Sequence, residues 1–467
     1  MTTMISTFSP FSTRMEAEDL PPIFIQTFAY YYEQLVTGQT GYIAEDEIEP
    51  VRELPDVEQF PPYLEKIGEQ ALRKTAVIKL NGGLGTSMGL EKAKSLLTVK
   101  DGLTFLDIIA RQAQLANVPL LLMNSFTTEA DSLALLEKYP DLNHDLPHSF
   151  LQHKEPKVQR DNLMPVEWPE NPELEWCPPG HGDIYTALVT SGMLEALLDQ
   201  GYAYAFVSNA DNLGAVVDLA ILGYFVDNEI PFMMEVADRT EMDKKGGHLA
   251  QRPDGQLILR ESAQCPPEDT AEFQNIQRHK YFNTNNLWFH LPTLYRQMKA
   301  HDNRLGLPMI RNRKTVDPRD PNSTPVYQLE TAMGSAIAVF QGAQAIRVPR
   351  SRFAPVKTCN DLLAVRSDAY TLTADYRVVP SGSRRMRQFN INLDDRYYKY
   401  VGDLDARFPA GVPSLVQNKS LLVEGDFCFG KDVVCQGDVW LRNETAVQIH
   451  IPDGTILSGK HHYEKKP

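Results

Sequence analysis

Cysteine is scarce in this sequence, and the five that occur are scattered along it. They are Cys177, Cys265, Cys359, Cys428 and Cys435, in a chain of 467 residues. No two of them have the Cys-x-x-Cys spacing of a zinc site, and an odd number does not make a complete disulfide framework. We therefore expect free thiols.

Long hydrophobic runs are also missing. No stretch approaches the roughly 20 apolar residues that a membrane-spanning helix needs. The N-terminus, MTTMISTFSPFSTRMEAEDL, lacks the apolar segment of a signal peptide. We expect a cytoplasmic protein without a membrane partner.

The sequence also lacks an excess of positive charge. Lys and Arg number 46 against 61 Asp and Glu, so the formal net charge is −15. Nucleic acids and anionic membranes reward clustered positive charge, so this balance argues against both as partners. A phosphate-bearing ligand would need a local site.

The composition itself is that of a folded globular protein, with 42% hydrophobic and 23% charged residues. The length exceeds the roughly 250–300 residues that one hydrophobic core usually supports. We predict three units: a helical N-terminal segment (1–70), a large central domain (71–404) and a β-rich C-terminal domain (405–467).

The middle of the chain alternates short apolar runs with helical periodicity, which indicates an α/β fold with a parallel sheet. We predict strands at 75–80, 118–125, 149–153, 203–211 and 230–237, with the sheet ending near residue 236. Helices are expected at 128–139, 181–198 and 213–227, and another behind a possible N-cap at Thr104. Residues 154–179 lack periodicity and predict a long loop.

The final sixty residues show short alternating strands and turn glycines, with almost no helical signal. The spacing is typical of the coils of a small β-helix or another compact β module.

A glycine-rich segment, KLNGGLGTSMG (79–89), directly follows the first of these strands. Such a loop can aim backbone N–H groups at an anion, and glycines permit the close approach. No frame of the segment supplies the G-x4-G-K-[ST] of a P-loop. The pattern G-x-G-x-x-x-G is closer to a dinucleotide-binding loop, but the second strand ends in Asn124 and Ser125 instead of the acid that would hold a ribose. A purely structural turn is the third interpretation, and four glycines in eight residues disfavour it.

Charged and amide side chains follow several of the predicted strands. Lys94, nine residues after Gly85, could place a cation over phosphates. Asp211 lies at the carboxyl end of the strand predicted at 203–211, at the edge where open α/β sheets bind ligands, and a carboxylate among phosphates indicates Mg²⁺. Gln152 offers an amide donor and acceptor, which the edge of a base requires. Gly180 and His181 open a helix, where amides and an imidazole could meet a base or a phosphate.

Taken together, these segments resemble the UTP–glucose-1-phosphate uridylyltransferases, also called UDP-glucose pyrophosphorylases. KLNGGLGTSMG…KSLL looks like the nucleotide loop of that family. Six further segments resemble family segments in the same order: FLQHKEPKV, PPGHGDIY, FVSNADNLG, FNTNNLW, QLETAMG and VPRSRFAPVKT. The resemblance covers about residues 20 to 460.

The resemblance implies a Rossmann-like nucleotidyltransferase core, with a mixed and mostly parallel GT-A-like sheet, followed by a C-terminal left-handed β-helix used in subunit association. It implies that Lys357 and Lys94 are catalytic and that Asp211 is the metal ligand. The nucleotide-binding residues would be Leu80, Asn81, Gly82, Gly83, Lys94, Gln152, Gly180, Asp211 and Lys357. The residues facing glucose 1-phosphate would be His181, Asn209, Ala210, Gly247 and Asn285, although Asn283 and Asn286 could share the role of Asn285.

The reaction implied is UTP + glucose 1-phosphate → UDP-glucose + pyrophosphate, with Mg²⁺ as cofactor and a homo-oligomer through the C-terminal domain. A UDP-N-acetylhexosamine or broad-specificity UDP-sugar pyrophosphorylase is the alternative within the same fold. Its loop usually ends in Thr-Arg-Leu-Gly, where this chain has Thr86-Ser87-Met88-Gly89. An NAD-dependent oxidoreductase and a non-catalytic nucleotide sensor remain as alternatives from other classes.

Overall fold

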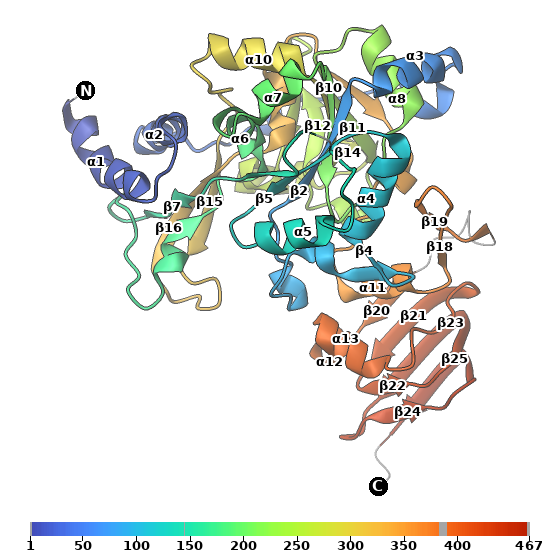
Figure 1. Cartoon of the computed structure of the whole chain (residues 1–467). Helices are drawn as coiled ribbons and strands as arrows, with labels where there is room; N and C mark the ends of the chain where they lie inside the picture. Colours follow the sequence, from blue (N-terminus) through green and yellow to red (C-terminus); the bar gives the residue numbers. More distant parts are fainter. Residues whose placement is uncertain (1, 144, 383–389, 465–467) are drawn as a thin grey trace.

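The computed structural model describes residues 2–143, 145–382 and 390–464 (Figure 1). Its largest sheet has ten strands in the order β1-β12-β14-β10-β2-β5-β6, with β11 beside β14, β17 beside β11 and β13 beside β12. β10, β2, β5 and β6 are parallel to one another, whereas β14 is antiparallel to both β10 and β11. The strands are β1 (Glu49–Pro50), β2 (Thr75–Asn81), β5 (Leu120–Asn124), β6 (Ser149–Leu151), β10 (Tyr204–Asn209), β11 (Phe232–Asp238), β12 (His248–Gln251), β13 (Leu257–Arg260), β14 (Tyr281–His290) and β17 (Gln344–Arg347).

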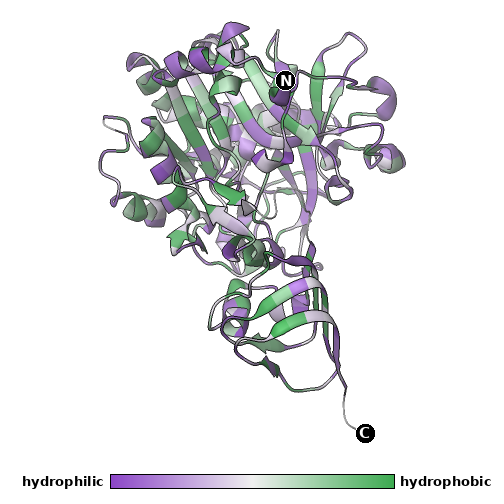
Figure 2. Cartoon of the chain, turned by 90° about the vertical axis from the view of Figure 1, so that its right-hand side faces the viewer, coloured by the Kyte–Doolittle hydropathy of each residue, from purple (hydrophilic) through white to green (hydrophobic). Residues whose placement is uncertain are grey.

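The strands β2, β5 and β10 are mostly apolar because both faces of the sheet are covered. Alternate residues of a strand face opposite sides. In β2, Ala76 and Ile78 pack in one cluster with residues of α6, α7 and α10, while Val77 packs in another with α4 and α5. Figure 2 shows the hydrophobic colour on the central strands and much hydrophilic colour on the outer helices. The mixed α/β core predicted from the sequence is confirmed. The helices are α1 (Thr2–Ala17), α2 (Pro22–Val36), α3 (Tyr63–Leu72), α4 (Phe105–Ala116), α5 (Glu129–Leu136), α6 (Ile184–Thr190), α7 (Met193–Asp199), α8 (Leu219–Asp227), α9 (Thr270–Phe273), α10 (Leu291–Ala300), α11 (Cys359–Arg366), α12 (Asp395–Tyr398) and α13 (Val401–Arg407).

Two predicted helices have different bounds in the structure. The helix expected at 181–198 is a 3-10 turn followed by α6 and α7, because Gly192 takes a left-handed conformation (φ 73°) between the two helices. The helix expected from residue 213 begins only at Leu219. Asp218 caps α8 there by accepting from the N–H groups of Ala220 and Ile221. The N-cap expected at Thr104 is confirmed, since its hydroxyl accepts from the N–H of Asp107 at 3.0 Å.

The predicted end of the sheet near residue 236 is wrong. The sheet continues through β12, β13, β14 and β17, and β14 inserts antiparallel between β10 and β11. A chain that returns through the middle of a sheet pairs strands that are distant in sequence. Local periodicity does not report such pairing.

The N-terminal helices cover the segment predicted as a long loop. Residues 154–179 contain the short strands β7 (Glu155–Pro156), β8 (Val158–Gln159) and β9 (Trp176–Cys177). Phe24 of α2 stacks on His153, just before these strands, with ring centroids 4.2 Å apart. Arg14 of α1 donates to the carbonyl oxygen of Val166 and to the carboxylate of Glu175. In Figure 1, α1 and α2 lie at one side of the sheet, next to β7, β15 and β16.

The C-terminal unit consists of two small parallel sheets. One has the order β20-β21-β23-β25 and the other pairs β22 with β24. In Figures 1 and 2 this unit projects from the core. Because β20 lies upstream of Asp405 and α13 spans that residue, a boundary at Asp405 would cut through the unit, and we place the start of its sheet at Asn390. The strands are β20 (Asn390–Leu393), β21 (Asn418–Glu424), β22 (Phe427–Phe429), β23 (Val434–Asn443), β24 (Ile449–Ile451) and β25 (Ile456–Tyr463).

A shared hydrophobic cluster joins the C-terminal unit to the rest of the molecule. Met88 and Leu97, from the segment after β2, are buried in the same cluster as Leu404 and Phe408. None of the helices in the described ranges is long and apolar enough to cross a membrane. The remaining strands are β3 (Thr98–Lys100), β4 (Leu103–Thr104), β7 (Glu155–Pro156), β8 (Val158–Gln159), β9 (Trp176–Cys177), β15 (Ile310–Thr315), β16 (Pro325–Glu330), β18 (Tyr370–Leu372) and β19 (Val378–Pro380).

Candidate active site

The glycine-rich loop leaves β2 at the carboxyl edge of the sheet and turns twice. Gly85 and Gly89 have positive φ values of 69° and 74° and flank a 3-10 turn at Thr86–Met88. The N–H of Lys94 then donates to the carbonyl oxygen of Gly83 at 3.1 Å, which closes the loop on itself. The fold of the loop therefore depends on the glycines that the sequence singled out.

The first residues of the predicted nucleotide site are held by the sheet. The side-chain amide of Asn81 is buried and donates to Asn124 Oδ1 at 2.7 Å and to Ser132 Oγ at 2.8 Å. The carbonyl oxygen of Leu80 accepts from the N–H of Ala210 at 3.1 Å. These contacts engage the side chain of Asn81 within the protein and tie the start of the loop to the end of β10.

Gly82 lies directly against Gln152. A Cβ atom on Gly82 would fall 2.9 Å from Gln152 Oε1. Gln152 Nε2 donates to the carbonyl oxygen of Gly180 at 2.9 Å. The structure thus brings together three of the residues assigned to the nucleotide: Gly82, Gln152 and Gly180.

The turn that carries Gly180 and His181 packs against Thr331. Gly180 has a φ of 77°, and a Cβ there would lie 2.5 Å from the carbonyl oxygen of Thr331. His181 Nδ1 accepts from the N–H of Met333 at 2.9 Å. Burial lowers the pKa of His181 to about 4, so the imidazole is neutral at pH 7. With Nδ1 accepting, the ring proton is on Nε2, and His181 is a neutral hydrogen-bond donor.

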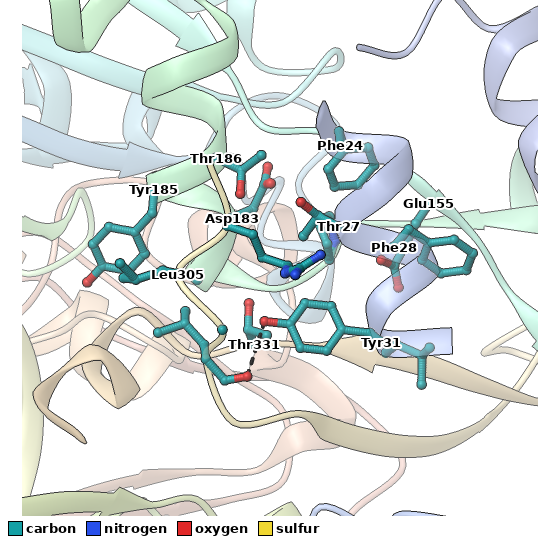
Figure 3. A pocket seen from close by; sticks show the side chains of 16 residues that line it. Phe24, Thr27, Phe28, Tyr31, Glu155, Asp183, Tyr185, Thr186, Leu305 and Thr331 are labelled. Carbon is teal, nitrogen blue, oxygen red and sulfur yellow. Dashed lines mark hydrogen bonds between the residues drawn. The ribbon is translucent and has the colours of Figure 1, made fainter. Parts of the chain in front are cut away.

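A small cavity lies behind this turn, between α2 and the loop that contains Leu305 (Figure 3). Its volume is about 20 Å³, room for one water molecule. Tyr31 on its wall donates to the carbonyl oxygen of Leu307. Burial together with the nearby Glu330 and Asp183 raises the pKa of Glu155 in the same wall. The cavity lies next to the turn and is too small for a substrate.

Lys94 and Asp211 meet at the centre of the carboxyl edge. Lys94 Nζ lies 2.7 Å from Asp211 Oδ2, and both side chains are mostly buried, with 16% and 20% of their surfaces exposed. Asp211 follows β10 as predicted. Its other oxygen, Oδ1, is buried and has no hydrogen-bond partner within the described residues. A buried carboxylate oxygen without a partner is costly unless a ligand satisfies it.

Backbone contacts bring the segment before Lys357 to Asp211. The N–H of Val356 donates to the carbonyl oxygen of Asp211 at 3.2 Å, and the side chain of Asn212 accepts from the N–H of Ala354 at 3.0 Å. Lys357 is exposed at the start of α11, with its Nζ 5.7 Å from the ring centroid of Phe353. The structure therefore places the backbone of Lys357 one residue from a backbone contact with Asp211.

Three of the residues considered for the sugar side, Gly247, Asn283 and Asn285, form a second group. A Cβ on Gly247 would lie 2.6 Å from the carboxylate of Glu261. Burial raises the pKa of Glu261 to about 7, against opposing effects of Asn283 and Lys357. Asn283 Nδ2 donates to Asn285 Oδ1 at 2.8 Å, and Asn285 has a φ of 58°.

Asn286, considered for the sugar side, and Ala210, assigned to it, are both engaged within the protein. Asn286 is buried, and its side-chain amide donates to Glu235 at 3.0 Å. Ala210 is also buried, and its N–H donates to the carbonyl oxygen of Leu80. Asn209 ends β10 and is half-buried beside them.

Buried charged side chains, including Arg352, Glu235 and Lys79, lie in the core next to the site. The guanidinium of Arg352 makes two 2.7 Å hydrogen bonds to the carboxylate of Glu235, and Trp288 also donates to that carboxylate. Lys79, buried in β2, donates to Ser208 and to the carbonyl oxygen of Ala215, and burial lowers its pKa to about 7. The basic cluster at Arg347, Arg350 and Arg352 is thus engaged by carboxylates.

Sequence reasoning missed Glu261, Glu235 and Lys79. A signal was available for two of them, because Lys79 and Glu235 are single charges inside apolar strand runs. Glu261 lies at the end of β13 with no such contrast, and only the fold brings it to Gly247.

Comparison with known proteins identifies the family. A family model described as UTP–glucose-1-phosphate uridylyltransferase matches residues 24–436. The chain belongs to that family. The uridylyltransferase of Solanum tuberosum is 42% identical over 419 residues, which cover 88% of this chain and 85% of that protein. The uridylyltransferase of Saccharomyces cerevisiae is 44% identical over 394 residues, covering 83% and 77%.

Solved structures of the family agree with the fold. One mutant form of the UDP-glucose pyrophosphorylase from Leishmania major has a TM-score of 0.92 and 44% identity, covering 99% of this chain and 100% of that one. Another mutant form of the same protein, solved in complex with UDP-glucose, has a TM-score of 0.89 and 45% identity, covering 98% and 99%. The chain is an enzyme of UDP-glucose formation from UTP and glucose 1-phosphate. The oxidoreductase alternative finds no support in these comparisons.

Proposed function

We propose that this uridylyltransferase acts by in-line attack of the sugar phosphate on the α-phosphorus of UTP. A phosphate oxygen of glucose 1-phosphate forms the new bond to the α-phosphorus. The bond from that phosphorus to the bridging oxygen breaks, and pyrophosphate leaves with the electron pair. The nucleophile is already an anion, so no general base is needed. The protein contributes positioning and charge neutralisation.

The observation that carries this proposal is the meeting of Lys94, Asp211 and the Lys357 segment at one edge of the sheet. Lys94 belongs to the glycine-rich loop and Lys357 to the start of α11, so the two cations approach from different elements. Charge that develops on the phosphates during transfer would lie between them. Lys94 neutralises the triphosphate, and Lys357 stabilises the charge at the α-phosphorus.

We propose Mg²⁺ as the cofactor, held by Asp211. The described residues contain no cluster of three or more His, Cys, Asp or Glu that could hold a metal. Mg²⁺ commonly takes only one or two carboxylates and completes its shell with substrate phosphates and water. The unpartnered Oδ1 of Asp211 fits that donor set. When bound, the ion would neutralise phosphate charge. Asp211→Asn should raise the Mg²⁺ concentration for half-maximal rate, and an unchanged metal dependence would rule Asp211 out as a ligand.

The uracil pocket is assigned to Gln152 and Gly180, which are joined by a hydrogen bond at the side of the loop. An amide side chain and a backbone carbonyl provide the donors and acceptors that a pyrimidine edge needs. The adjoining loop residues Gly82 and Gly83 then lie along the phosphates. The base therefore enters beside β6 and the triphosphate extends toward Asp211.

We assign the glucose 1-phosphate side to His181, Asn209, Ala210, Gly247 and Asn285, and we add Glu261 because it lies against Gly247. A neutral His181 can donate from Nε2 to an oxygen of the sugar phosphate. Because the imidazole carries no positive charge, it leaves the negative charge of the attacking phosphate in place. Carboxylate and amide groups such as Glu261 and Asn285 are suited to sugar hydroxyls.

A pyrophosphate-release assay tests the substrate assignment. UTP, dTTP, CTP and ATP would each be combined with glucose, galactose, mannose and N-acetylglucosamine 1-phosphates. We expect UTP with glucose 1-phosphate to give the highest kcat/KM. A higher value with N-acetylglucosamine 1-phosphate would establish the acetylhexosamine alternative instead.

We also propose that the C-terminal strands form a left-handed β-helix that serves self-association. The alternation of strands between two parallel sheets supports a coiled arrangement. Sedimentation velocity of the full chain and of a variant altered at β25 would test association, and a monomer at all concentrations would contradict it. A cytoplasmic location is proposed on the five free cysteines; cell fractionation tests it.

A further inference from the structure

Two loops from distant parts of the chain meet beside the proposed active site. We call residues 239–247, which end at the sugar-side Gly247, the sugar loop. We call residues 349–357, which end at Lys357, the lysine segment. About a hundred residues separate the two in sequence, and two sets of side-chain contacts link them in space.

An ion pair forms the first link. Arg350 NH1 lies 2.8 Å from Asp243 Oδ2, and NH2 lies 3.4 Å from Oδ1. Asp243 is 8% exposed and also accepts from the N–H and hydroxyl of Thr240, so its carboxylate is fixed within the sugar loop. A bidentate pair to a fixed, buried carboxylate holds the arginine more firmly than a surface pair would.

Aromatic rings form the second link. Gly246 of the sugar loop packs so closely on Phe282 that a Cβ atom there would clash with the ring. The ring of Phe282 in turn lies 5.0 Å from that of Phe353 in the lysine segment. A shift of the sugar loop would therefore press on Phe282 and, through it, on Phe353.

Both links lead to the ring of Phe353, which lies near Lys357. The Arg350 guanidinium lies 5.5 Å from the centroid of the Phe353 ring, and Lys357 Nζ lies 5.7 Å from it. A cation at this distance is attracted to the face of the ring. Within the described residues Lys357 forms no ion pair. The ring of Phe353 is therefore a side-chain contact that can orient Lys357, whose charge also acts on the nearby Glu261.

We propose that Arg350 and Phe353 are positioning residues for Lys357 and couple it to the sugar loop through Asp243 and Phe282. In this arrangement, a sugar phosphate that orders the sugar loop also orders the lysine that acts on the α-phosphorus. The inference rests on the proposed role of Lys357 and adds residues that do not themselves touch substrate.

The ring is tested with Phe353→Leu and Phe353→Tyr, measured for kcat and for KM of both substrates. We expect Phe353→Leu to lower kcat about 5-fold, the size of one cation–π contact, with the KM for UTP within about 2-fold. Phe353→Tyr keeps a ring and should restore kcat. Tyr295→Leu is the matched control, because it removes another half-buried ring under a lysine, Lys299 at 5.2 Å, on α10.

The route through Lys357 is tested by a double-mutant cycle. If Phe353 acts by positioning the lysine, Phe353→Leu should cause no further loss of kcat in a Lys357→Ala background. Additive losses would overturn the inference while leaving the role of Lys357 intact. A Lys357→Ala variant with full kcat would instead overturn the role of Lys357 itself.

The Arg350–Asp243 ion pair provides a second test in case the ring variants fold poorly, because Arg350 is partly exposed. Arg350 is 38% exposed, so Arg350→Met should be tolerated by the fold. We expect it to lower kcat and raise the KM for glucose 1-phosphate together, and to show no additional effect in an Asp243→Asn background. Equal losses with and without the Asp243 substitution would show that the pair does not couple the two loops.

Discussion

At the scale of single residues, the contact between Gly82 and Gln152 makes a steric prediction. A methyl group at residue 82 would lie 2.9 Å from Gln152 Oε1 and would turn that side chain away from Gly180. We expect Gly82→Ala to raise the KM for UTP about 5- to 10-fold, the value of one hydrogen bond, with a smaller effect on kcat. Initial-rate kinetics measure both. Gly402→Ala is the control, because Gly402 has open space around its Cα. An unchanged KM in Gly82→Ala would remove Gln152 from the base pocket.

The raised pKa of Glu261 makes a second prediction at this scale. Its carboxyl has a pKa of about 7, so it is ionised above pH 7 and protonated below. The ionised form is the better acceptor for sugar hydroxyls. We expect the KM for glucose 1-phosphate to fall as pH rises from 6 to 8, and to fall less in Glu261→Gln. Titration of the substrate phosphate is common to both proteins and cancels in the comparison. Parallel profiles would show that Glu261 does not contact the sugar.

Other residues show why the site was only partly predictable from the sequence. Asp211, Gln152 and the glycines of the loop follow strands that local periodicity identified, so their places at the carboxyl edge could be predicted. Glu261 and Asn283 come from β13 and β14, which reach the site through antiparallel returns of the chain. Such pairings depend on long-range packing, which leaves no local pattern in the sequence.

At the scale of elements, the start of α11 fixes the backbone of Lys357. Asp361 accepts from the N–H of Lys357 at 2.9 Å and from that of Thr358 at 2.8 Å. Asp218 caps α8 in a similar way, by accepting from two N–H groups. The two carboxylates can therefore be compared by mutation. Asp361 lies beside the proposed catalytic lysine, whereas Asp218 caps a helix that packs on α3.

We expect Asp361→Ala and Asp218→Ala each to cost about 1 kcal/mol of unfolding free energy, as the loss of a helix cap does. Only Asp361→Ala should lower kcat, because only that carboxylate holds the Lys357 backbone. Urea unfolding and steady-state kinetics on both variants check this. Equal kcat values in the two variants would show that the position of Lys357 does not depend on the cap.

Elements also differ in how far the sequence specified them. The strands β2, β5 and β10 and the capped helix α4 match their predictions closely, because apolar runs and a capping box are local signals. The break between α6 and α7 was missed, since a single Gly192 is compatible with a continuous helix until its positive φ is seen. β20 was also missed, because it forms only by pairing with β21.

At the scale of the whole molecule, the C-terminal unit and the nucleotide loop share one hydrophobic cluster. Met88 and Leu97 are buried with Leu404 and Phe408. Gly89 of the loop also packs on Tyr400, where a Cβ would lie 2.9 Å from the ring. Burial common to two units links their unfolding. We expect scanning calorimetry to show one main transition, and two well-separated transitions would contradict this linkage.

The molecule as a whole is acidic, with a net charge of −15, yet its substrates are polyanions. Lys94 and Lys357 supply local positive charge at one edge of the sheet, beside Asp211. In the mechanism proposed above, Lys357 stabilises charge during transfer and contributes less to holding the product.

The most direct test of that role compares two quantities in Lys357→Ala: kcat for UDP-glucose formation and the Kd for UDP-glucose measured by calorimetry. We expect kcat to fall by about 100-fold or more, as for loss of a charge that stabilises a transition state. The Kd should change by only a few-fold. An equal loss in both quantities would show that Lys357 binds the nucleotide sugar uniformly and would contradict its proposed role in the transfer step.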